Sequence, residues 1–326
     1  MAGNDGKSVN VDKTIADCLF ELPQLNEFLV QTAKKELGED EFVREQSLEQ
    51  MREWIAQNRR IKHCRTDDRF LLRFLRVRKF SVVRACETLQ KYLIMRQTYP
   101  QWCKNLDPLD KDLQTVLNFC ALLPVGRDNA GRIVIVGIVR NFDAHRFNSD
   151  LMIRLNMLVT ESLIDEEANQ VAGFTHVFDN SDMTLAHVTC WSLENLTGYL
   201  RSVINGIPIR LKQNHFVNVP GFAAQTSKYC LSYASEKLKS RIYCHRNLDE
   251  LMQNIDVSLL PKEYGGMVPL DELNERFKKY LLQKRDMLLA LDEMEIQIAN
   301  SSGKTHKSAD IVDVGAAGSF RKLQID

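Results

Sequence analysis

One run of seven residues, Ile133–Val139 (IVIVGIV), constrains the fold of this chain more than any other feature. All of its residues except one glycine are β-branched, and no polar residue alternates with them, so it predicts a strand. A strand that is apolar on both faces must have both faces covered. That is typical of a central strand in a parallel or mixed sheet flanked by helices. The run therefore predicts an α/β fold.

The chain after Asp107 continues this pattern, with short β-rich runs separated by helical stretches. Such alternation is the signature of βα units. We predict further strands at Thr175–Phe178, His215–Val219 and Arg241–His245. We predict helices at Asp150–Asn169, Leu193–Asn205 and Gly221–Ser240, and a charged helical stretch at Leu270–Asn300.

The first third of the chain has a different pattern. From Leu22 to about Met95, apolar residues recur at three- and four-residue steps, which predicts helices, and strand signals are absent. Asp67 and Asp68 form a candidate helix start, followed by an apolar face with arginines on another side. The expected organisation is a flexible N-terminus at 1–21, an all-helical domain at 22–100, an α/β domain at 101–284, the end of a C-terminal helix at 285–300 and a flexible tail at 301–326.

Composition argues against several functional classes. The 326 residues include 43 basic and 43 acidic side chains, so no global charge attracts the chain to nucleic acid or to an anionic membrane. No apolar leader opens the sequence, and no uncharged apolar run reaches the roughly eighteen residues that a membrane span needs. The eight cysteines form no Cys-x-x-Cys pair, which argues against zinc and against a disulfide framework. Reduced thiols and a cytoplasmic location are expected.

The usual catalytic motifs are absent. GxGxxG, GxxxxGKS/T, GxSxG and HExxH do not occur, and no two of the seven histidines are three or four residues apart. The segment Asp179–Asp182 (DNSD) resembles the start of a calcium loop, but Met183 occupies the fifth position and no glycine follows. It indicates a strand-end turn instead. We therefore predict no enzymatic activity, no metal and no cofactor.

His176 is the histidine of most interest. It shares the strand parity of Phe174 and Phe178, so the three side chains are expected to point into the same apolar space. The residue is either a buried, hydrogen-bonded structural histidine or a ligand contact, and the residues alone favour the structural role.

Positive charge is concentrated between positions 201 and 241. Glu236 is the one acid in this segment, whose basic residues are Arg201, Arg210, Lys212, Lys228, Lys237, Lys239 and Arg241. Acidic residues cluster elsewhere, as in Glu161–Glu167, which predicts a dipolar molecule with one face attracted to anionic lipid. An ordinary solvated face is an equal alternative.

The helix predicted inside the basic segment is amphipathic. One side of it carries Phe222, Thr226, Tyr229, Cys230 and Tyr233. This pattern fits a core-facing helix as well as it fits a movable lid that exposes apolar groups beside a membrane.

Several blocks of the sequence resemble the CRAL-TRIO family, in particular its branch of cellular retinaldehyde-binding protein, alpha-tocopherol transfer protein and clavesins. The resemblance spans about Leu22–Lys284, and its most specific blocks are DDRFLLRFLRVRKF (67–80), FDNSD (178–182), HFVNVPGF (215–222) and SLLPKEYGG (258–266). In the last block Tyr264 can anchor a turn in which Gly265 and Gly266 adopt dihedrals closed to other residues. The closing GSFRKLQID resembles the endings of arthropod members.

The resemblance implies a helical CRAL-TRIO N-terminal domain and a lipid-binding domain with a mixed or parallel sheet, whose flanking helices enclose a ligand pocket. A gate helix would follow Asn218–Pro220 and span Gly221–Leu238, with gate residues Phe222, Tyr229, Cys230 and Tyr233. The implied pocket residues are Ile153, Asn156, Met157, Thr160, Phe174, His176, Phe178, Met183, Trp191, Tyr199, Ser202, Val203, Ile207 and Asn214. The implied phosphoinositide-binding residues are Arg78, Arg210, Lys212, Lys237 and Arg241.

The implied function is that of a cytoplasmic carrier that binds one lipophilic molecule and docks peripherally on endosomal or other membranes that contain phosphoinositides. Four polar pocket positions favour a retinoid, a sterol-like compound or another lipid with a polar group over tocopherol: Asn156, Thr160, Ser202 and Asn214. The alternative is a phosphoinositide-binding adaptor in membrane traffic that transfers no lipid.

Overall fold

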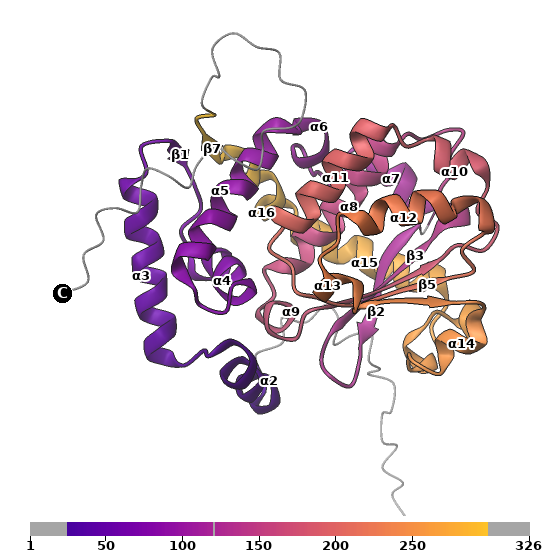
Figure 1. Ribbon diagram of the computed structural model, residues 1–326, viewed down its shortest axis with the longest axis horizontal. Helices are drawn as coiled ribbons and strands as arrows, with labels where there is room; N and C mark the ends of the chain where they lie inside the picture. Colours follow the sequence, from indigo (N-terminus) through magenta and orange to yellow (C-terminus); the bar gives the residue numbers. More distant parts are fainter. Residues whose placement is uncertain (1–24, 120, 299–326) are drawn as a thin grey trace, which may run out of the picture.

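A mixed five-stranded sheet lies at the centre of the molecule. The computed structural model describes residues 25–119 and 121–298 (Figure 1). The strand order is β2-β3-β4-β5-β6, and the strands are β2 (Leu122–Arg127), β3 (Ile133–Ile138), β4 (Phe174–Asp179), β5 (Leu211–Val217) and β6 (Ile242–His245). The predicted α/β class is confirmed. The two predicted flexible ends and the arthropod-like ending lie outside the described residues.

The strands β3 to β6 are parallel to one another, and β2 is antiparallel to β3. β3 is buried along its whole length, as its apolar run predicts, although β4 is the central strand. The sequence pattern does not predict β2, because Pro124 and Gly126 interrupt its apolar run. The structure tolerates both residues at the edge of the sheet, where the register shifts between them.

Helices form most of the chain before the sheet. They are α2 (Glu27–Thr32), the π-helix η1 (Ala33–Leu37), α3 (Glu41–Gln57), α4 (Asp68–Val77), α5 (Val82–Thr98), α6 (Pro100–Cys103) and α7 (Lys111–Asn118). Asp67 caps α4, as predicted, by accepting a hydrogen bond from the backbone N–H of Phe70.

The last described residues return to this helical region. After α15 (Leu270–Gln283), α16 (Arg285–Ala290) and the 3-10 turn η6 (Leu291–Glu293), the chain forms β7 (Glu295–Ile296). β7 pairs antiparallel with β1 (Ile61–His63), and Figure 1 shows the two side by side. The predicted helical stretch through Asn300 and the predicted absence of strands before Met95 are therefore wrong. Strands of two and three residues are too short to produce an alternating pattern.

Buried ion pairs join α4 to the sheet region. The guanidinium of Arg73 lies 2.8 Å from a carboxylate oxygen of Glu161 and 2.6 Å from one of Asp165. Glu166 pairs with Lys284 at 2.7 Å. These three acids are buried, so they do not contribute to the surface of the dipolar molecule that the sequence predicts.

The remaining helices surround the sheet. They are α8 (Ser149–Ile164), α9 (Glu167–Ala172), α10 (Leu185–Thr189), α11 (Leu193–Asn205), α12 (Ala224–Ser232), α13 (Glu236–Lys239) and α14 (Leu248–Met252), with 3-10 turns η2 (Val139–Asn141), η3 (Gly221–Ala223), η4 (Val257–Leu259) and η5 (Lys262–Tyr264). α11 has its predicted bounds. The predicted helices Asp150–Asn169 and Gly221–Ser240 are instead divided, the second into η3, α12 and α13. In the view of Figure 1, α11 and α12 lie above the strands and α14 below them.

The DNSD segment forms the predicted strand-end turn after β4. The backbone N–H of Ser181 donates to a carboxylate oxygen of Asp179, and Asp182 has a φ of 58°. Tyr264 anchors the loop around η5 to this turn, since its hydroxyl donates to the other oxygen of Asp179 at 2.8 Å. Gly265 has a φ of 90°, a conformation that favours glycine.

Candidate functional site

One face of the sheet gathers aromatic side chains from two central strands. On β4, the ring centroid of His176 lies 6.4 Å from that of Phe174 and 5.8 Å from that of Phe178. On β5, Asn214 is the register partner of His176, and Phe216 is that of Phe178. The rings of Phe178 and Phe216 stack with their centroids 5.3 Å apart. We call these five side chains the aromatic face; their shared orientation confirms the parity argument made from the sequence.

The aromatic face is desolvated yet retains accessible surface. Desolvation by burial lowers the pKa of His176 to about 4, so the ring is neutral at physiological pH. The side chains of His176 and Phe178 are only half-buried, whereas Thr175 and Val177, which point to the opposite face of β4, are fully buried. The two faces of the central strand therefore differ in how completely other side chains cover them.

The other implied pocket residues come mainly from α8, α11 and the segments next to α11. The buried ones are Ile153, Met157, Ser202 and Ile207. The half-buried ones are Asn156, Thr160, Met183, Trp191, Tyr199 and Val203. One hydrophobic cluster contains Ile153, Met157, Phe174 and Ile207, and packs against Phe178, Trp191, Tyr199 and Val203. The structure thus brings these apolar side chains together with the aromatic face.

The polar side chains among the implied pocket residues differ in whether they have hydrogen-bond partners. The amide of Asn156 donates to the carbonyl of Met152 at 3.0 Å, and the hydroxyl of Ser202 donates to the carbonyl of Gly198 at 2.7 Å. Each of these bonds lies within the helix that carries the side chain. By contrast, the Oδ1 atom of Asn214 is buried without a hydrogen-bond partner among the residues that the structure describes.

The predicted gate segment is held against α11 by hydroxyl groups. The hydroxyl of Tyr229 on α12 is 2.7 Å from that of Thr197 on α11 and 2.9 Å from that of Tyr233. We call these three side chains the tyrosine latch. Cys230 is half-buried on the same helix, whereas Phe222 is 48% exposed, so this residue of the predicted gate set lies at the surface.

Part of the predicted phosphoinositide site is assembled around a carboxylate. The side chains of Arg210 and Lys212 each bond to Oε2 of Glu36 at 2.6 Å. Desolvation raises the pKa of Glu36, but the hydrogen bonds and charges of Lys212 and Arg210 outweigh it and hold the pKa below its usual value. Arg241 is near enough that its charge contributes to lowering the pKa of Arg210, after desolvation as the main cause. We call Arg210, Lys212 and Arg241 the basic cluster.

The other two predicted cations have other surroundings. Arg78 follows α4, where its Nε donates to the hydroxyl of Thr88 at 2.7 Å. Lys237 is exposed on α13. In residues 25–119 and 121–298, neither side chain forms an ion pair or hydrogen bond with the basic cluster. Glu36 has no signal in the sequence, because it comes from η1 in the helical region, 174 residues before Arg210.

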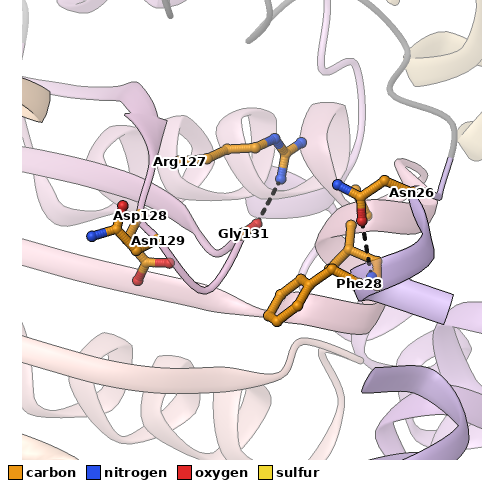
Figure 2. A pocket seen from close by; sticks show the side chains of 8 residues that line it. Asn26, Phe28, Arg127, Asp128, Asn129 and Gly131 are labelled. Carbon is orange, nitrogen blue, oxygen red and sulfur yellow. Dashed lines mark hydrogen bonds between the residues drawn. The ribbon is translucent and has the colours of Figure 1, made fainter. Parts of the chain in front are cut away.

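A separate cavity of about 360 Å³ lies between the start of α2 and the β2–β3 turn. Figure 2 shows Asn26 and Phe28 on one side and Asp128 and Asn129 on the other. Arg127 donates to the carbonyl of Gly131 at 3.1 Å beside it. None of the implied pocket, gate or phosphoinositide residues lines this cavity.

No helix within residues 25–119 and 121–298 is long and apolar enough to cross a membrane. Over the same residues, no group of three or more His, Cys, Asp and Glu side chains is arranged to hold a metal ion.

Comparison with known proteins places the chain among relatives. Residues 121–266 match the family described as CRAL/TRIO domain, and residues 40–113 match that described as Pinta-like, UBA domain. Clavesin-1 of Xenopus laevis is 30% identical over 248 residues, which cover 75% of this chain and 74% of clavesin-1. Clavesin-2 of Homo sapiens is 30% identical over 243 residues, which cover 74% of each chain.

A solved structure titled "Crystal structure of Sfh5" covers 81% of this chain and 99% of its own, with 16% identity and a TM-score of 0.49. The sequence match over three quarters of the chain and the mixed sheet with its flanking helices lead to one assignment. The chain belongs to the CRAL/TRIO family of lipid-binding proteins and is related to the clavesins.

Proposed function

We propose that this protein is a non-enzymatic carrier, which binds one lipophilic molecule against the aromatic face and exchanges it at phosphoinositide-containing membranes of the cytoplasm. Proteins of this family are in general non-enzymatic lipid carriers. One observation supports the proposal: His176 on the central strand is desolvated by burial and yet, like Phe178, keeps accessible surface.

His176 has two properties that together favour an internal space beside it. The pKa of His176 is lowered by desolvation alone, so bulk water does not surround the ring. The residue is nevertheless only half-buried, so its neighbours do not cover it completely. Tyr199 has the same combination, since desolvation raises its pKa to about 12 while its side chain keeps accessible surface. Space lined by Phe174, Phe178 and Phe216 favours an apolar occupant.

The basic cluster is the proposed membrane contact. A lipid phosphate would take the place of the Glu36 carboxylate, because both present oxygen acceptors to Arg210 and Lys212. Cationic side chains near an anionic bilayer each contribute roughly 1 kcal/mol of attraction. The segment η3 to α13 precedes Arg241, so membrane docking and movement of the gate segment would involve the same part of the chain.

The test is transfer of a fluorescent lipid between vesicles of phosphatidylcholine with and without a phosphatidylinositol bisphosphate. The double variant Arg210→Ala/Lys212→Ala should lose most of the acceleration by phosphoinositide, because the acceptor phosphates lose both partners. The matched control Arg246→Ala/Lys262→Ala removes two exposed cations elsewhere and should retain it.

The outcomes separate the candidate functions. Equal acceleration in both double variants would reject the basic cluster as the membrane contact. Vesicle binding without transfer of any lipid probe would instead support the adaptor function. Mass spectrometry of lipid extracted from the purified protein gives an independent test, since a carrier should retain a lipophilic molecule.

A further inference from the structure

The aromatic face contains two polar side chains that the protein itself leaves without partners. His176 and Asn214 are opposite each other in the register of β4 and β5, and their side chains share one face of the sheet. Within the described part of the chain, the buried Oδ1 of Asn214 accepts no hydrogen bond, and neither the amide nitrogen of Asn214 nor the ring of His176 takes part in one. A desolvated polar group without a hydrogen-bond partner destabilises the protein, so a ligand that supplies the partner gains affinity.

The chemistry of the two side chains defines what would satisfy them. A neutral imidazole offers one N–H donor and one acceptor nitrogen, and a carboxamide offers an acceptor oxygen and two N–H donors. A hydroxyl group matches this set, since it donates one hydrogen bond and accepts others. An ether, an ester or an aldehyde only accepts, so it would leave the Oδ1 of Asn214 without a donor.

The surroundings also select for a neutral ligand. The ring of His176 lies between the rings of Phe174 and Phe178 and opposite Asn214 in the register, so these neighbours are all uncharged. A carboxylate or phosphate placed here would lose its hydration without gaining a cation, which is costly in an apolar space. The cations of the basic cluster are held by Glu36 and by the backbone carbonyls of Val171 and Leu211.

We propose that His176 and Asn214 bind the hydroxyl group of a neutral lipid alcohol or phenol, and that they discriminate against the corresponding ether, aldehyde and acid. This inference rests on the proposed carrier function, and it adds the chemical class of the cargo. The other polar residues near the face do not contribute to this selection in the same way, because Asn156 and Ser202 already bond within their own helices.

The experiment measures affinity for matched probes that differ only in the polar group. Retinol, α-tocopherol and 1-hexadecanol are each compared with their methyl ethers, and retinol also with retinaldehyde and retinoic acid. On the scaffold that binds best, the free hydroxyl should bind about tenfold more tightly than the ether, which corresponds to one net hydrogen bond. Asn214→Leu should reduce this ratio to near one, and His176→Phe should reduce it while preserving the shape of the ring.

A variant of the same face controls for packing. Phe216→Leu should weaken the alcohol and the ether by the same factor, because it removes apolar contact and no hydrogen-bonding group. Circular dichroism of each variant verifies that the fold is retained, and either polar variant is sufficient for the comparison.

Three results would overturn the inference. If alcohol and ether bind the wild type equally, or if the ratio survives in both polar variants, the hydroxyl site is wrong while the carrier function stands. If the acid binds best, the neutral cargo is wrong. If no scaffold binds and no lipid is extracted, the proposed function fails together with the inference.

Discussion

The behaviour of His176 follows from its neighbours on β4 and β5. Phenylalanine rings lie on both sides of it along the strand, and the residue opposite is an uncharged amide. Protonation would place a positive charge among these groups without a counter-ion, so the folded protein keeps the ring neutral. A residue that is neutral at physiological pH suits a site for a neutral ligand. It also makes the stability of the fold depend on pH.

Replacing His176 with phenylalanine should reduce the pH dependence of stability. The wild-type unfolded state takes up a proton near pH 6.5 and the folded state only near pH 4. Stability therefore falls as the pH drops through this window. Between pH 7 and pH 5 the expected loss from this residue is about 2 kcal/mol in the free energy of unfolding. Urea denaturation of both proteins at the two pH values measures it, and an equal loss in both would contradict the prediction.

At the scale of elements, α12 is a short helix held to the rest of the protein by few interactions. None of its residues is buried, and the tyrosine latch connects it to α11. Asn218 before it has a φ of 57° and donates to the hydroxyl of Ser181 at 2.7 Å, which fixes the start of the segment. When the start of a segment is fixed and the rest of it forms few contacts, the segment can move away from the protein after only a few hydrogen bonds break.

The variant Tyr229→Phe should therefore speed lipid exchange. It removes the hydroxyl shared by Thr197 and Tyr233, and a hydrogen bond of this kind contributes about 1 kcal/mol. The open state should become roughly fivefold more populated, and transfer between vesicles faster by up to the same factor. The control Tyr243→Phe removes an exposed hydroxyl on β6. A transfer rate for Tyr229→Phe no higher than that of the control would argue against the latch.

The whole molecule couples its helical region to its sheet region through charge. Arg76 of α4 bonds to Glu39 at 2.6 Å and to Glu167 of α9 at 2.7 Å, and Arg73 lies in a second buried network. Removing one member of such a network leaves the others uncompensated. The contact between Glu36 and the basic cluster is different, because the carboxylate is exposed enough for another anion to replace it.

Replacing Glu36 with glutamine should strengthen binding to phosphoinositide vesicles. The substitution removes the internal competitor for Arg210 and Lys212 but retains the size of the side chain. An exposed ion pair contributes at most about 1 kcal/mol, so we expect up to a fivefold gain in vesicle affinity at low salt. Glu45→Gln makes the same charge change on α3 and provides the control. Co-sedimentation with vesicles measures both, and equal affinities would show that Glu36 does not compete.

Local patterns in the sequence predict the parts of this structure that depend on local physics. The parity of Phe174, His176 and Phe178 predicts their common face, because side chains alternate in any strand. The capping role of Asp67 is equally local. The sequence pattern does not predict β2, because a strand tolerates its proline and glycine only at the edge of a sheet. Which strand lies at the edge is decided by the whole fold.

Contacts between distant segments have no such local signal. Glu36 meets Arg210 through the packing of η1 on the sheet region, and an acid in an early helix looks the same whether or not it finds a partner. The burial of Glu161 is another case. A run of acids predicts a charged surface, but in the structure Arg73 of α4 pairs with Glu161 and compensates its charge. The pocket residues taken from the family resemblance remain proposals, to be tested with the matched probes.

The pairing of β7 with β1 has a consequence for how the protein is made. Ile296 is fully buried, and its strand completes a small sheet whose other strand ends at His63. A nascent chain leaving the ribosome would present the helical region first, yet that region would keep an unpaired strand edge until nearly the last described residue had emerged. Its assembly must therefore wait until the segment that contains β7 has been made.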